Sequence, residues 1–199
     1  MVQWAQMIEV NAYKYRYNGF EMYQILLNVF NALPILRKNR KSKTVDEAFI
    51  ERIMLAVTEV NGCAVCSYAH TKMALESGFT MEEIESFFSG SDTYIKPEEA
   101  VGILFAQNYA DNRGVFDSST YKTLVNHYGE DKSQIILAAA KVMMAGNVIG
   151  LPMSAFSSRL KGKKYTNSSL LYEITMLFAP LVLVPLGALH ALFKKLTHL

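Results

Sequence analysis

Two cysteines and a histidine stand close together in the middle of the chain, at spacings that suit thiol chemistry. Read from Glu51, the sequence is ERIMLAVTEVNGCAVCSYAH, so Cys63 and Cys66 form a CxxC pair and His70 follows four residues later. On a helix, residues three and four apart share one face, which aligns both thiols with the imidazole. Helical residues i and i+3 lie about 5 to 5.5 Å apart at Cα, within the range of a disulfide. Reversible oxidation of the pair is therefore feasible.

A reactive cysteine must be a thiolate, and a thiol with a pKa near about 8.5 is mostly protonated at neutral pH. The positive end of a helix beginning at Cys63 favours a thiolate there. The His70 imidazole can instead accept a proton from Cys66, directly or through a water molecule. These two effects favour different nucleophiles, and the residues alone leave the choice open.

Glu51 is the predicted fourth member of the site. An Asn61-Gly62 turn would fold its helix back beside the CxxC helix, so that the carboxylate can meet His70. There it would orient the imidazole and raise its basicity. Without the motif, Glu51 would be interpreted as an exposed surface residue.

Other interpretations of the same residues are open. A set of Cys63, Cys66, His70 and Glu51 could bind zinc, although the second CxxC or histidine pair that usually completes such a site is absent. The cysteines could also be buried and inert. Covalent haem attachment requires a histidine directly after the second cysteine, where Ser67 stands. A purely structural disulfide is disfavoured, because closing so short a loop removes little unfolded-state entropy.

Apolar spacing and turn residues predict an all-α chain without strands or repeats. Helices are predicted from Phe20 to Leu36, Thr44 to Asn61, Cys63 to Ser77, Thr80 to about Phe88, Ala100 to Asp111, Ser118 to His127, and Asp131 to Ala145, with a short segment ending at Leu160.

Capping and breaking residues set the predicted boundaries of these helices. Thr44 with Glu47, and Thr80 with Glu83, form capping-box patterns. Proline is expected to stop or bend the first helix at Pro34, leaving residues 37–43 as a solvated basic connector. The sequence Gly150-Leu151-Pro152 is expected to break the helix that precedes it.

The C-terminal segment from Ile174 to Phe193 contains no charged residue and is followed by Lys194-Lys195. Its length would permit a membrane span. Pro180 and Pro185 would break a helix near its middle, and His190 lies inside the stretch. We therefore expect a bent helical arm packed in an oligomer rather than a membrane span.

Composition narrows the class of protein. The length of 199 residues suits one domain. With 20 basic and 18 acidic residues, the chain lacks the excess positive charge that binds a nucleic-acid backbone, so nucleic acid is not an expected partner. A hydrophobic share of 51% suggests that some surface is buried against copies of the chain or against lipid. The N-terminal segment, residues 1–18, lacks the pattern of a secretory signal, so a cytoplasmic location is expected.

Glu51 together with NGCAVCSYAH resembles the carboxymuconolactone decarboxylase and alkylhydroperoxidase D (AhpD)-like superfamily. The resemblance covers about Thr44 to Lys161 and is closest from Glu51 to Gly78, with weaker similarity in the segment GNVIGLPMSAF. It implies an AhpD-like helical bundle with a single repeat that assembles as a trimer or hexamer. Residues 1–43 would form an N-terminal helical arm, residues 44–162 the redox core, and residues 163–199 an apolar C-terminal helical arm.

The resemblance also implies roles for the site residues. Cys66 would attack a hydroperoxide, Cys63 would resolve the sulfenic acid as a disulfide, and His70 with Glu51 would relay protons. A thiol or disulfide reductant protein would restore the thiols, and no metal or other cofactor is implied. Val65 stands where peroxidase members often carry a histidine or other polar residue. The alternative function is a non-catalytic zinc-binding or redox-sensing oligomeric module.

Overall fold

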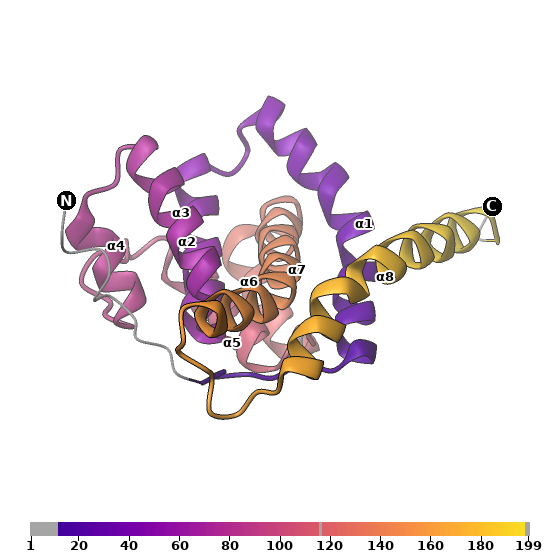
Figure 1. Cartoon of the computed structure of the whole chain (residues 1–199). Coiled ribbons are helices and arrows are strands. Elements are labelled where there is room, and N and C mark those ends of the chain that lie inside the picture. The colour runs from indigo at the N-terminus through magenta and orange to yellow at the C-terminus, as the bar shows by residue number, and fades with distance from the viewer. Residues whose placement is uncertain (1–11, 116, 198–199) are drawn as a thin grey trace.

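The computed structural model describes residues 12–115 and 117–197, and within these ranges the chain forms helices and no strand (Figure 1). This confirms the predicted all-α class. The helices are α1 (Gly19–Ser42), α2 (Glu47–Asn61), α3 (Ala64–Glu76), α4 (Met81–Phe88), α5 (Ala100–Asp111), α6 (Ser118–Tyr128), α7 (Glu130–Leu160) and α8 (Leu170–Thr197).

Helix α7 lies at the centre of the bundle and contacts α1, α2, α3, α5, α6 and α8 (Figure 1). Its sequence is apolar on almost every face, as a helix surrounded by other helices requires. Four of its side chains are at most 1% exposed: Ile136, Ala139, Met144 and Val148. The CxxC helix α3 packs on the second half of α7, so α7 forms the floor of the candidate site.

The predicted start of α4 is confirmed, and that of α2 is wrong. Thr80 and Glu83 form the expected capping box at α4. At α2 the N-cap is Asp46, whose carboxylate accepts a hydrogen bond from the Ala48 amide. The Thr44 hydroxyl contacts the Ser42 hydroxyl instead. Aspartate is as good an N-cap as threonine, and here it lies directly before the first helical residue.

Helix α1 continues through Pro34 to Ser42, so the predicted basic connector is wrong. Proline removes only one backbone hydrogen bond, and tertiary contacts hold the turns that follow it. Asn39 is buried and its side chain holds the segment that follows the helix. Its Nδ2 donates a hydrogen bond to the Val45 carbonyl, and its Oδ1 accepts one from the Val45 backbone amide, both at 2.9 Å. The basic side chains therefore lie on the last turns of a helix.

The predicted break at residues 150–152 is also wrong, because α7 runs unbroken from Glu130 to Leu160. Leu151, Pro152 and Ala155 are buried on the faces that contact neighbouring helices. Burial on both sides of the proline compensates for the one hydrogen bond that it cannot make. Local propensity is overridden here by packing.

Helix α8 is likewise a single helix that passes through Pro180 and Pro185, so the predicted break is absent. Its first turn is fixed by Glu173, which is fully buried and receives two hydrogen bonds from Arg159 at 2.6 and 2.7 Å. This hydrogen bonding holds the pKa of the Glu173 carboxyl below its usual range. In Figure 1 the C-terminal part of α8 projects beyond the rest of the molecule.

In the described part of the chain, two helices are long and apolar enough to cross a membrane by length and composition alone. In α7 the most apolar window is 78% buried inside the protein, as expected of a core helix. The corresponding window of α8, within Leu170–Lys194, has a mean hydropathy of 2.1 and is only 11% buried.

Candidate redox-active site

A tight turn between α2 and α3 brings the predicted site residues together. Gly62 ends α2 in the left-handed conformation, with φ at +66°, and its amide donates to the Thr58 carbonyl at 2.9 Å. Glycine adopts this conformation without steric cost. Cys63 is then the N-cap of α3, one residue before the first helical residue, as the predicted turn requires.

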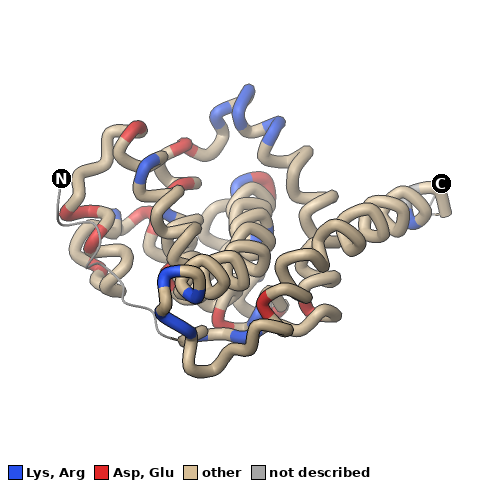
Figure 2. Tube along the Cα trace, viewed as in Figure 1, with Lys and Arg blue, Asp and Glu red and all other residues tan. Residues whose placement is uncertain are grey.

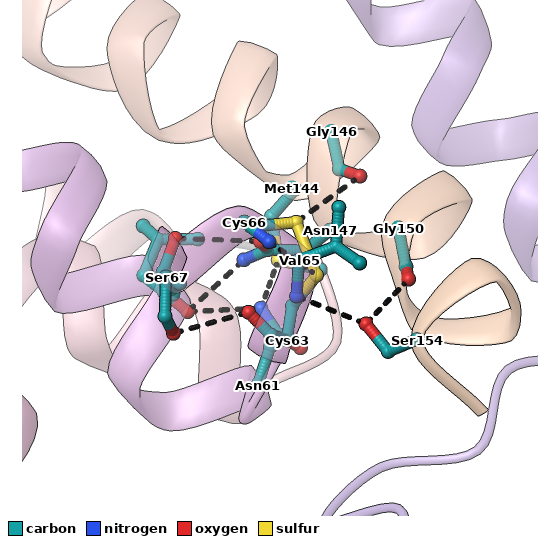
Figure 3. The surroundings of a disulfide bond; sticks show 12 residues. Asn61, Cys63, Val65, Cys66, Ser67, Met144, Gly146, Asn147, Gly150 and Ser154 are labelled. Atoms are coloured by element: carbon teal, nitrogen blue, oxygen red, sulfur yellow. Dashed lines mark hydrogen bonds between the residues drawn. A yellow bond between two sulfur atoms is a disulfide. The ribbon is translucent and has the colours of Figure 1, made fainter. Parts of the chain in front are cut away.

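Cys63 and Cys66 are joined by a disulfide with a Cα–Cα distance of 5.2 Å (Figure 3). The Cys66 backbone amide donates a hydrogen bond to the Cys63 sulfur at 3.3 Å. After reduction, this first-turn amide and the helix dipole would stabilise negative charge on Cys63.

The two cysteines differ in exposure. Cys63 is 0% exposed and Cys66 is 7% exposed, so an incoming reactant reaches Cys66 first. The Cys66 sulfur lies 3.6 Å from the Gly146 carbonyl oxygen, which can accept a hydrogen bond from the reduced thiol. Since that contact favours the protonated thiol, Cys66 requires a base to become a nucleophile.

Gly150 on α7 faces the disulfide directly (Figure 3). A Cβ atom built at this position would lie 2.5 Å from the Cys66 sulfur and 2.6 Å from the Cys63 sulfur. Only glycine therefore lets α7 cover both sulfurs. Local sequence patterns predict a helix break at Gly150 and do not reveal this role, although the small residues of GNVIGLPMSAF are the available signal.

Glu51 and His70 form a second pair, with 2.6 Å between the Glu51 Oε1 and His70 Nδ1 atoms. Their side chains are 10% and 13% exposed, so the contact is largely shielded from water. Arg52, the next residue on α2, is occupied by a buried two-bond ion pair with Glu99 and does not compete for Glu51. The pair fixes the orientation of the imidazole.

His70 stands one turn beyond Cys66 on α3, but no hydrogen bond joins its ring to either sulfur in the oxidised protein. The structure therefore holds the four predicted residues as two bonded pairs: the disulfide at the start of α3, and the Glu51–His70 contact between α2 and α3. Proton transfer between the pairs would occur in the reduced state or through a water molecule.

Ser154 is a further residue of the site, and no local sequence pattern indicates it. Its hydroxyl accepts a hydrogen bond from the Val65 amide at 3.1 Å and donates to the Gly150 carbonyl at 2.8 Å. Val65 lies in the first turn of α3, where backbone amides have no partner within the helix. Ser154 thus ties the CxxC turn to α7.

Replacing Ser154 with alanine is expected to lower the free energy of unfolding by about 1 to 3 kcal/mol, because a shielded amide loses its partner. Urea denaturation of the oxidised protein measures this change. Ser157→Ala is the matched control on the same helix, since Ser157 is only half-buried, and it should stay within about 0.5 kcal/mol of the parent. Equal effects of the two substitutions would contradict the proposed tie.

The zinc alternative does not correspond to a formed site in this oxidised structure. In the described residues, no group of three or more histidine, cysteine or acidic side chains is placed to hold a metal ion. Both sulfurs are bonded to each other.

Residues 28–107 match the model of the carboxymuconolactone decarboxylase family. The match covers 80 of the 199 residues, so the chain is similar to that family over this segment. Carboxymuconolactone decarboxylase family members include decarboxylases and AhpD-like peroxidases, and the helical fold with a CxxC disulfide fits the AhpD-like group. The matched segment contains all four predicted site residues and ends before Gly150 and Ser154. Comparisons with curated proteins and with solved structures give no match.

Proposed function

We propose that this protein is a thiol-dependent peroxidase and disulfide oxidoreductase that reduces organic hydroperoxides through Cys63 and Cys66. The observation that carries the proposal is the disulfide at the start of α3, with His70 one helical turn further along α3 and held there by Glu51 of α2. A base held by a carboxylate near an accessible thiol is the arrangement that thiolate chemistry requires.

In the oxidative half of the cycle, the Cys66 thiol gives its proton to His70 and the thiolate attacks one oxygen of the hydroperoxide. The O–O bond breaks, Cys66 becomes a sulfenic acid, and the alkoxide takes up a proton from His70 to leave as an alcohol. Glu51 keeps the imidazole oriented while it accepts and returns this proton.

Cys63 then attacks the Cys66 sulfur, the S–O bond breaks, and water leaves as the disulfide forms. In total, one hydroperoxide and two thiols give one alcohol, one water molecule and one disulfide. An external dithiol protein would attack the sulfur of Cys66, the more exposed cysteine, and release Cys63 as a thiolate, which the Cys66 amide stabilises.

Stopped-flow mixing of the reduced protein with cumene hydroperoxide tests the proposal. One equivalent of hydroperoxide should be consumed per chain, with loss of both thiols and a mass that corresponds to an intramolecular disulfide. Thiols that persist beside excess hydroperoxide would contradict the proposed function. Oxidation without turnover in the presence of a dithiol reductant would favour the redox-sensing alternative.

Replacing Glu51 with glutamine is expected to slow hydroperoxide reduction about 10- to 100-fold, because His70 loses the anionic partner that orients it. The rate of thiol loss after mixing with hydroperoxide measures this effect. Glu47→Gln is the matched control one turn earlier on α2, since its side chain is 62% exposed and is paired with Lys43 rather than with His70. A rate for Glu51→Gln equal to that of the control would exclude the proposed relay.

Assembly as a trimer or hexamer and a cytoplasmic location stay predictions from the sequence.

A further inference from the structure

One side of α8 carries a continuous apolar surface that no other part of the described chain covers. We define the α8 outer face by its exposed apolar side chains, whose exposed fractions range from 38% to 71%. They are Phe178, Leu181, Val182, Val184, Leu186, Leu189, Leu192, Phe193 and Leu196. At about 100° per residue, this face spans roughly 200° of the helix circumference.

The opposite side of α8 is bound to the protein by specific contacts. Gly187 is buried against the ring of Phe30 on α1, where an added Cβ would come within 3.0 Å of the ring. The Tyr23 hydroxyl lies 2.7 Å from the His190 ring nitrogen Nδ1. The helix therefore has one side fitted to α1 and an open apolar side.

The structure of α8 weakens both arguments against lipid that the sequence suggested. Pro180 and Pro185 lie inside an unbroken helix, so they do not expose backbone groups by ending it. His190 has a hydrogen-bond partner on α1. No charged residue occurs between Glu173 and Lys194, and Glu173 is buried in its pair with Arg159.

The width and composition of the α8 outer face favour lipid over a second protein surface. Protein interfaces carry a polar rim, and a single partner helix covers a narrower stripe than half the circumference. The α8 outer face has no charged rim along its length. Figure 2 shows α8 free of acidic and basic residues from its first turns until close to its C terminus. There Lys194 is exposed, and its positive charge suits the headgroups of anionic lipids.

We infer that the α8 outer face binds a lipid bilayer and holds the redox site at a membrane surface. Because Phe30 and Tyr23 fix α8 to α1, a perpendicular crossing would draw α1 into the hydrocarbon region. The helix instead lies with its outer face in the boundary between headgroups and acyl chains, while its inner face stays on the protein. This attachment is independent of the proposed peroxidase activity.

Flotation of the full-length protein with lipid vesicles in a density gradient tests the inference. The vesicles are made of phosphatidylcholine alone or of phosphatidylcholine mixed with an equal amount of phosphatidylglycerol. The parent protein should float with the mixed vesicles. The double variant Leu181→Asp with Leu189→Asp should show at least about a tenfold lower partition coefficient, because two charges must enter the lipid boundary.

The double variant Leu104→Asp with Leu160→Asp is the matched control. These leucines are 63% and 74% exposed on α5 and α7, so the control adds the same charge to other exposed apolar positions. It should float like the parent, and far-UV circular dichroism should show both variants folded. A parent protein that stays with the soluble fraction in both vesicle types overturns the inference. Self-association of the parent in sedimentation velocity also overturns the inference if Leu181→Asp with Leu189→Asp abolishes that association and the parent does not float.

Discussion

Replacing Cys66 with serine is expected to abolish hydroperoxide reduction, whereas replacing Cys63 with serine should preserve a single oxidation. Cys66 is the more exposed of the two cysteines and lies one turn before His70, so the proposed function assigns the attack on the hydroperoxide to its sulfur. Serine at position 66 offers no thiolate, and its hydroxyl is far too weakly acidic to replace one. The loss should be at least about a thousandfold in rate.

The two serine variants are each other's controls. Stopped-flow measurement of hydroperoxide consumption gives the rates, and mass spectrometry after dimedone trapping locates the oxidised sulfur. In Cys63→Ser the sulfenic acid should accumulate at Cys66, because no second thiol can resolve it. The assignment of nucleophile and resolving cysteine is reversed if the trapped sulfenic acid appears at Cys63 in Cys66→Ser.

Replacing Gly150 with alanine is expected to destabilise the disulfide form selectively. The added Cβ would overlap both sulfurs at 2.5 and 2.6 Å, and α7 and α3 would have to move apart. Overpacking of this kind costs about 1 to 3 kcal/mol. In the reduced protein the two thiols can rotate separately, so the penalty falls mainly on the oxidised state. The reduction potential should therefore rise by about 20 to 60 mV.

Equilibration of the variant with glutathione redox buffers measures this potential, and urea denaturation of both redox states measures the stabilities. Gly146→Ala is the matched control one turn earlier on α7, because its added Cβ would meet only the Met143 methyl group at an ordinary 3.5 Å. Alanine there should stabilise the helix by up to about 1 kcal/mol and leave the potential unchanged. If both variants keep the parent potential, Gly150 does not control the disulfide.

Most of the helices could be predicted from local patterns, and the errors share one cause. Capping at Thr80 and the glycine turn at Gly62 depend on neighbouring residues only, and both were predicted. The breaks expected at Pro34 and Pro152 failed, because buried contacts on both sides of each proline outweigh one lost hydrogen bond. Such contacts come from helices far away in the sequence, which no local pattern reveals.

The same division applies to the candidate site. The spacing of Cys63, Cys66 and His70 by itself determined that two thiols and an imidazole share one helical edge, because helix geometry follows from separation in the chain. Only the tertiary structure decided that Gly150 and Ser154 close over that edge, since α7 reaches it from some 80 residues further along the chain. Tertiary packing likewise decided which side of α8 stays open, because burial depends on neighbours in space and not on the order of residues.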